Sequence, residues 1–182
     1  MKRTLGTLTV VGLGFFTPLH ADAGDVSCRV PGGRAVATGE VAKLIAVPTP
    51  SGSALLACIR RSGRKIALDD SYTDARLARR WAAWQRVGRP GHWRIAVQDL
   101  RTGKSRLVNG HVAAHSLGLT AAGTVVWAQE QDSGGGTPLY ANEVGRGGRL
   151  LDGGTVDARS VRLAGRRVSW LSGGQRRAAI VR

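Results

Sequence analysis

Three tryptophans spaced 43 residues apart constrain this chain more than any other feature of its sequence. The segments LARRWAAW, LTAAGTVVW and LAGRRVSW end at Trp84, Trp127 and Trp170. A fixed period of about 40 to 45 residues, filled by short apolar runs and glycine-rich turns, is typical of proteins built from a repeated sheet of short strands. We therefore predict an all-β chain in which the three tryptophans occupy equivalent core positions.

The chain divides into four units of this period. Each of the first three contains short apolar strands joined by turns, whereas the last contains three strand candidates and lacks a fourth. One segment, residues 74–84, has a helical pattern, but its counterparts in later units contain glycine, which favours a turn and a strand instead. The units cover residues 34–70, 74–110, 116–154 and 160–182, and a lead-in strand is expected at residues 25–30.

A second register, independent of the tryptophans, supports the same division. When the units are anchored on a turn glycine, three large aliphatic residues fall at one position of the repeat. The glycines are Gly63, Gly103 and Gly147, and the aliphatic residues are Leu55, Ile95 and Leu139. Because alternate side chains of a strand share a face, the residue two before each tryptophan lies on the same side as the ring. We expect that face to pack between neighbouring sheets.

Two of these units carry a family resemblance. The segments LTAAGTVVWAQEQDSGGGTPLYANEVGRGGRLL and LARRWAAWQRVGRPGHWRIAVQDLRTGKSRLV resemble the repeats of TolB-type, WD-repeat-like β-propellers, and the resemblance extends over about residues 41–182. In that family, a Ser-Pro-Asp-Gly-like turn precedes an apolar strand of the repeat. In this chain the corresponding turn is reduced to Ala-Gly or Arg-Arg. The resemblance implies β-propeller-type blades of four antiparallel strands, about 3.5 to 4 of them in this chain. It implies little about function, because such propellers host many unrelated activities.

The N-terminus has the features of a secretory signal peptide. A basic start is followed by a short apolar run, and Ala21-Asp22-Ala23 places small residues where a signal peptidase reads them. We predict that residues 1–23 are removed after Ala23, leaving a repeat domain at residues 24–182 that is secreted or periplasmic.

Export gives the two cysteines a meaning. In an oxidising compartment, an even pair indicates a disulfide, and Cys28 with Cys58 is the one pairing available. The alternative is two separate buried thiols. Two cysteines without a nearby third cysteine or histidine do not complete a tetrahedral metal site.

No catalytic, cofactor-binding or metal-binding residues are assigned from the sequence. LSGGQRR at 171–177 resembles an ATPase signature and RTGKS at 101–105 the end of a P-loop, but neither precedes a helix, so we interpret both as turns and expect no nucleotide. His111 and His115 lie in a linker, and His92 lies in a turn. The motifs of serine hydrolases and zinc proteases are missing from the sequence.

The formal charge of +15 is the remaining functional signal. Such a charge attracts nucleic acid, anionic lipid or an acidic polymer of the cell envelope. The basic residues are spread over all units, however, which argues against a specific polyanion site. We interpret the chain as an exported binding or interaction module of unknown ligand. The alternatives are an enzyme with a site in the propeller channel, which we favour less, and a polyanion-binding protein.

Four blades are few for a closed ring. The lead-in strand would supply the missing strand of unit four if the ring closed. We favour an incomplete arc, finished by a second copy or another protein, over a closed four-bladed monomer. An open arc would expose apolar faces around Val168 and Ile180, so we expect it to self-associate.

Overall fold

The structure, a computed structural model, describes residues 28–182 except 51, 88–92, 114 and 132–135. The predicted signal peptide therefore lies outside the described residues. These form four antiparallel sheets, three of four strands and one of three, with no α-helix among them. In this part of the chain, no helix has the length and apolar character needed to cross a membrane.

Each sheet is a simple meander in sequence order, and we call the sheets blades one to four. Blade one comprises β1 (Arg34–Thr38), β2 (Ala42–Thr49), β3 (Gly52–Ile59) and β4 (Lys65–Asp69). Blade two comprises β5 (Tyr72–Ala78), β6 (Trp81–Arg86), β7 (Arg94–Asp99) and β8 (Ser105–Asn109). Blade three comprises β9 (Gly118–Leu119), β10 (Val125–Ala128), β11 (Leu139–Glu143) and β12 (Gly147–Asp152). Blade four comprises β13 (Arg162–Ala164), β14 (Arg167–Ser172) and β15 (Gln175–Ile180), preceded by a short 3-10 turn, η2 (Ala158–Ser160).

These strands confirm the predicted division into units, including a fourth unit with three strands. Residues 74–84 form a strand, a two-residue turn and a second strand rather than a helix. The lead-in strand is a wrong prediction where it can be checked, since residues 28–30 belong to no strand and enter a turn in which Gly33 N donates to Val30 O.

In blades two, three and four, the tryptophan-bearing face packs against the preceding blade. Trp84 lies in a cluster with Leu44 and Leu55 of blade one, Trp127 in a cluster with residues of blade two, and Trp170 in a cluster with residues of blade three. The three side chains are 3%, 3% and 4% exposed. The second register is also found in the structure. Leu55, Ile95 and Leu139 are fully buried, and the turn glycines Gly63, Gly103 and Gly147 have φ of 66°, 76° and 81°. A positive φ is a conformation that glycine adopts without steric cost, so these turns select it.

A buried carboxylate of one blade holds the tryptophan of the next at two of the three junctions. Asp69, which ends β4, accepts a hydrogen bond of 2.7 Å from Trp84 Nε1, and Asp152, which ends β12, accepts one of 2.7 Å from Trp170 Nε1. An arginine completes each group: Arg86 Nε lies 2.7 Å from Asp69 Oδ2, and Arg177 Nη1 lies 3.1 Å from Asp152 Oδ2. We call each group a carboxylate clasp.

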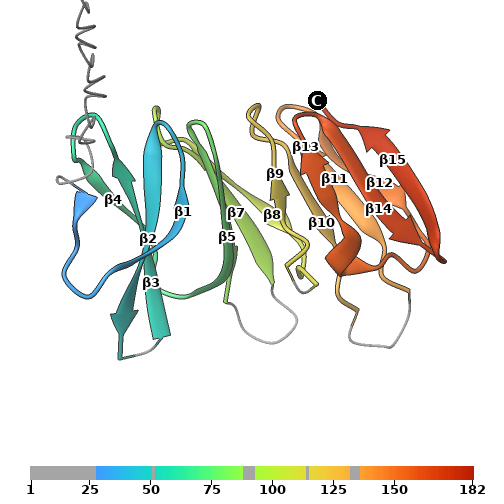
Figure 1. Cartoon of the computed structure of the whole chain (residues 1–182), viewed down its shortest axis with the longest axis horizontal. Helices are drawn as coiled ribbons and strands as arrows, with labels where there is room; N and C mark the ends of the chain where they lie inside the picture. Colours follow the sequence, from blue (N-terminus) through green and yellow to red (C-terminus); the bar gives the residue numbers. More distant parts are fainter. Residues whose placement is uncertain (1–27, 51, 88–92, 114, 132–135) are drawn as a thin grey trace, which may run out of the picture.

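The four blades form an open arc. Blades one and four lie at opposite ends of the row in Figure 1. The described N-terminal segment stays with blade one, where Cys28 and Cys58 form a disulfide with Cα atoms 5.7 Å apart. The disulfide confirms the predicted pairing, and its location means that the segment around Cys28 does not pair with blade four as a closed ring would require.

The N-terminal segment covers the face of blade one that has no preceding blade. Ile45 pairs with Leu56 in the register position that Trp84 occupies in blade two, and it is 3% exposed under the disulfide. Gly33 approaches so closely that a Cβ there would lie 2.8 Å from Ile45 Cγ2. The disulfide therefore fastens a cap over one end of the arc.

The free face of blade four carries a charge at a position that is apolar in blades one to three. Arg176 stands in the register position of the buried Leu139, because Arg177 pairs with Trp170 as Tyr140 pairs with Trp127. The expected exposure of Val168 is wrong, since this side chain is fully buried against blade three, whereas Ile180 is 58% exposed. A charged outer face is how repeat proteins keep an end blade soluble.

Removing the disulfide tests the role of the N-terminal cap. Replacing both Cys28 and Cys58 by serine opens a loop spanning 30 residues, and we expect the free energy of unfolding to fall by about 3–4 kcal/mol in the chain-entropy model. Urea unfolding of the variant and the native protein measures this difference. Two thiols that react with an alkylating agent in the native, exported protein would contradict the assignment.

The clasp at Asp152 predicts an acid-sensitive junction. Burial raises the pKa of Asp152, but hydrogen bonds from Trp170, Gly154 and Ser172 and the charge of Arg177 outweigh it and hold the pKa below its ordinary value. The stabilisation is therefore complete above the unfolded-state pKa and is lost as pH falls through the folded-state value.

Asp152→Asn should lower the free energy of unfolding at pH 7 by about 1.5–3 kcal/mol, the range for hydrogen bonds to a charged group. The difference from the native protein should shrink below about pH 4, near the ordinary aspartate pKa. Chemical unfolding at a series of pH values measures both effects, with Asp70→Asn as the control because Asp70 is exposed. A difference that is independent of pH would exclude the charge of Asp152 as its cause.

Candidate anion-binding face and cavity

One end of the blades is strongly basic. In a four-stranded meander, the turns joining first to second and third to fourth strands lie at the same end, which is the upper end in Figure 1. We call this the turn end. Its turns carry the basic residues Arg60, Arg61, Arg64, Arg79, Arg80, Arg101, Lys104, Arg146 and Arg166, against the acidic residue Glu40.

The sequence prediction that basic residues are spread over all units is correct along the chain but missed this gathering in space. At the opposite end, the described connections carry Asp70, Glu130 and Asp157 beside Arg159. The charge is therefore polarised between the two ends. The signal that could have revealed it is the recurrence of arginine or lysine next to the turn glycines, which repeat with the same register as the tryptophans.

A cavity of about 700 Å³ opens at the turn end between blades one and two, with one residue from blade three. Its aliphatic lining comes from Val41, Ile59, Leu100 and Ala121. Its polar lining comes from Ser62, Arg64, Arg79, Arg80 and Arg101. We call this the arginine cavity. An apolar floor bordered by four guanidinium groups is suited to a ligand with both an apolar part and a negative charge.

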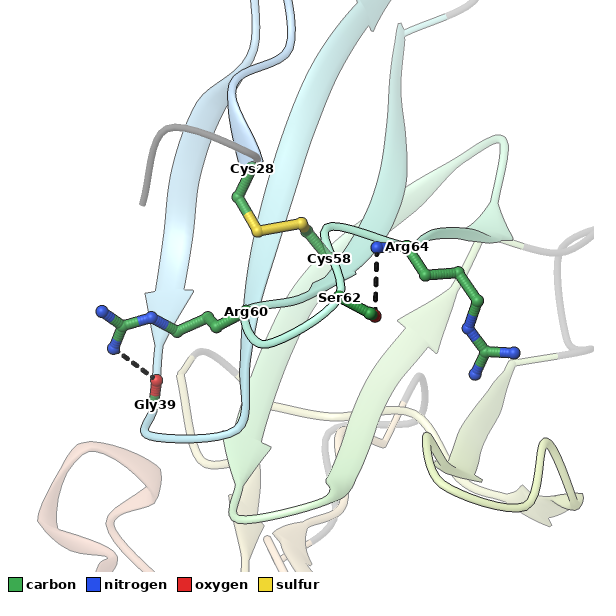
Figure 2. Close-up of a disulfide and its surroundings, with 6 residues drawn as sticks. All are labelled: Cys28, Gly39, Cys58, Arg60, Ser62 and Arg64. Carbon is green, nitrogen blue, oxygen red and sulfur yellow. Dashed lines mark hydrogen bonds between the residues drawn. A yellow bond between two sulfur atoms is a disulfide. The ribbon is translucent and has the colours of Figure 1, made fainter. Parts of the chain in front are cut away.

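Two of the arginines are held in place by neighbouring groups. Arg80 Nε lies 3.3 Å from the buried Asp99 Oδ2, and its guanidinium carbon lies 5.6 Å from the centre of the Trp81 ring. Arg64 Nη2 donates to Leu100 O over 3.4 Å. Figure 2 shows the Arg64 side chain leaving the β3–β4 turn on the side opposite to Arg60, whose Nη1 donates to Gly39 O at 3.2 Å. These contacts fix the orientations of the Arg64 and Arg80 side chains at the edge of the cavity.

The other two arginines are available to a ligand. Among the described residues, no side-chain hydrogen bond or ion pair engages Arg79 or Arg101, and both residues are exposed. Arg79 also has φ of 51°, the left-handed conformation that Gly165 adopts at φ 59° in the corresponding turn of blade four. A side chain at such a φ costs on the order of 1 kcal/mol relative to a relaxed turn. The fold itself does not require arginine at this position.

None of the described residues that line this cavity is a histidine, cysteine, aspartate or glutamate. The buried carboxylate of Asp99 contacts two of the lining residues: it is engaged by Arg80 and by the Arg101 backbone N–H at 2.9 Å. His111 instead stacks on Trp93, with ring centres 4.2 Å apart, and its Nε2 lies 3.5 Å from Glu130. Within the described residues, no three histidine, cysteine, aspartate or glutamate side chains lie together as metal ligands would.

A second carboxylate with an altered pKa lies on β5. Burial raises the pKa of Asp74, and its ion pair with Arg76 opposes that rise. Asp74 is not part of the arginine cavity lining.

The two segments that resemble nucleotide-binding motifs both include a turn between two strands. Gly103 lies in the β7–β8 turn, while Gly173 and Gly174 form the β14–β15 turn with φ of 56° and 78°. No helix follows either turn. His92, the third histidine of interest in the sequence, lies outside the described residues.

Comparisons with known proteins identify the fold. No family model matches the chain, and no curated protein matches it. Among solved structures, it is similar to TolB from Acinetobacter baumannii, with a TM-score of 0.51 and 15% sequence identity over 77% of this chain. The chain spans 38% of the length of that protein. The similarity and the four meander sheets show a β-propeller fold, as the sequence resemblance implied.

Proposed function

We propose that the protein is an exported, β-propeller-type binding module whose turn end binds an anionic ligand carrying an apolar group. The observation that supports this most directly is the arginine cavity, where an aliphatic floor meets four arginines. Charge-assisted hydrogen bonds from guanidinium groups are about twice as strong as neutral ones, and they suit carboxylate or phosphate oxygens. The aliphatic floor adds an area-dependent contribution from the apolar part of the ligand.

The polarised charge supports the same proposal from a longer range. A surface with one sign of charge attracts oppositely charged ligands and raises the rate of association, an effect that weakens with salt. The turn end supplies that surface around the cavity. An acidic polymer of the cell envelope is one source of such a ligand.

Export rests on the predicted signal peptide together with the disulfide. Disulfides persist in oxidising compartments and are rare in the cytosol, so the Cys28–Cys58 bond supports an extracytoplasmic location. Cleavage after Ala23 predicts a secreted protein that begins at Gly24. Intact-mass measurement of the exported protein tests this, and a mass that retains residues 1–23 would contradict it.

Titration with decanoate tests the ligand chemistry. The native protein should bind this ten-carbon carboxylate more tightly than acetate and should not bind decyltrimethylammonium, because both the charge and the chain contribute. Isothermal calorimetry at low ionic strength, below the micellar concentration, measures the affinities. Binding of the cationic amphiphile with equal affinity would show that the arginines play no part.

Variants separate the cavity from the overall charge. Arg79→Gly combined with Arg101→Ser should weaken decanoate binding by about tenfold or more, equivalent to 1.4 kcal/mol or more. The same variant should fold as stably as the native protein, because glycine relieves the left-handed conformation of residue 79. Arg159→Ser combined with Arg29→Ser is the matched control, since these exposed arginines are not among the cavity-lining residues. Equal losses in both variants would indicate an effect of net charge alone.

A further inference from the structure

We propose that a second cavity, between the outer strands of blades two and three, binds a neutral saccharide. It has a volume of about 690 Å³, within the usual range of small-molecule sites, about 300–1,000 Å³. Strands β8, β10, β11 and β12 supply most of its lining. We call it the amide groove, because asparagine and glutamine side chains are its main polar groups.

The amide groove lies at the one described junction where the carboxylate clasp is missing. Asn109 ends β8 where Asp69 ends β4 and Asp152 ends β12. In blades one and three, the register shifts just before the aspartate, since Leu55 pairs with Asp69 and Leu139 with Asp152 across a bulge. In blade two the pairing runs on without a shift from Val108 to Asn109.

The missing carboxylate changes the partner of the tryptophan. Trp127 Nε1 donates to Gln129 Oε1 of its own blade at 2.9 Å instead of to the preceding blade. Within the described residues, no arginine from blade three contacts the Asn109 side chain as Arg86 contacts Asp69. The end of the junction is consequently open at the surface.

The amide groups of the groove are partly free. Gln129 is engaged at both ends of its amide, since its Oε1 also accepts from His111 N at 3.2 Å and its Nε2 donates to Glu130 O at 3.2 Å. Asn142 Oδ1 accepts from Arg106 Nε at 3.2 Å, which leaves its NH₂ group for another acceptor. Asn109 and Gln131 are exposed, and no side-chain hydrogen bond engages them within the described part of the chain.

The groove also offers an apolar and aromatic surface. Tyr140 is half-buried and stacks on Trp127 with ring centres 5.5 Å apart. Leu107 and Leu150, on the outer strands of the two blades, are 49% and 53% exposed beside it. Aromatic and aliphatic side chains pack against the C–H face of a sugar ring, while amides both donate to and accept from its hydroxyls.

The charge of the groove favours a neutral ligand over an anion. Its one charged lining residue is Arg149, which is already engaged by Glu143 Oε1 at 3.4 Å and by Ile180 O at 2.7 Å. On a protein of charge +15, a surface region without a free cation differs from the arginine cavity in the ligand it selects. The two cavities are built from different residues, so one can bind as proposed without the other.

Titration with neutral oligosaccharides tests the proposal. The full chain is mixed with trisaccharides of glucose, mannose, galactose and N-acetylglucosamine, and binding is followed by Trp and Tyr fluorescence and by saturation-transfer NMR. At least one probe should bind with a millimolar or lower dissociation constant, and its binding should not change between low and high salt. If none binds below about 10 mM, the proposal is wrong.

A matched pair of variants locates the site. Asn109→Leu removes a free amide from the groove and should weaken binding of the positive probe at least tenfold. Gln175→Leu removes an exposed amide from β15 and should leave it unchanged. Both positions are exposed, so both variants should fold, and matching circular dichroism confirms that they do. Equal affinity of Asn109→Leu and the native protein would overturn the assignment.

Two other occupants give distinct results. A second copy seated in the groove would appear as concentration-dependent mass in sedimentation, abolished by Leu107→Ser. A partner peptide would give a different pattern. Leu107→Ser and Asn109→Leu would both leave every saccharide titration unchanged, and both variants would weaken binding of a peptide selected from a hydrophobic library. Either result would overturn the saccharide proposal.

Discussion

The burial of one tryptophan-bearing face against the preceding sheet is the interaction on which this structure depends. A four-stranded sheet of short strands cannot bury its hydrophobic faces alone, so it needs neighbouring sheets. At each junction, an indole from one blade packs against the aliphatic surface of the preceding blade. Stability then accumulates from neighbour to neighbour along the arc, and its two ends need separate solutions. A disulfide-fastened segment covers Ile45 at one end, and arginine replaces leucine at the other.

The junctions satisfy the indole in different ways, and the differences have structural consequences. Asp69 and Asp152 draw Trp84 and Trp170 across to the preceding blade, and their burial is compensated by arginine. At the middle junction, Arg106 provides the cross-blade contact instead, donating to Gly123 O at 2.6 Å and to Asn142 Oδ1 at 3.2 Å. Burial lowers the pKa of Arg106, which is the cost of placing a guanidinium there. That contact lies toward the turn end, so the far part of the junction stays open.

The parts of this fold that follow from the sequence are those with a local cause. Turn glycines at positive φ and alternating apolar residues act within a few residues, and they predicted the strands and the positions of Leu55 and Ile95. The partners of the indoles are not local: Asp69 precedes Trp84 by 15 residues, and Asp152 precedes Trp170 by 18. A pattern of single residues cannot assign such pairs, because the missing third case, Asn109, removes the repetition that would have revealed them. Both candidate cavities depend on neighbouring blades, so neither was predicted.

Strand residues that face a junction and exposed turn residues are under different constraints, and the arginine cavity lies among the turns. Strand positions that face a junction are restricted to residues that fill it, because a volume change of even one methylene group affects the packing of a close-packed interior. Exposed turn residues such as Arg79 and Arg101 lie outside the buried clusters that fill the junctions, so they can change without loss of the blade. Arg79 is the clearest case, because glycine at the equivalent Gly165 shows that the turn is made more easily without a side chain. Arg79 therefore carries a conformational cost that glycine would avoid, and this cost is one reason for its place in the proposed anion site.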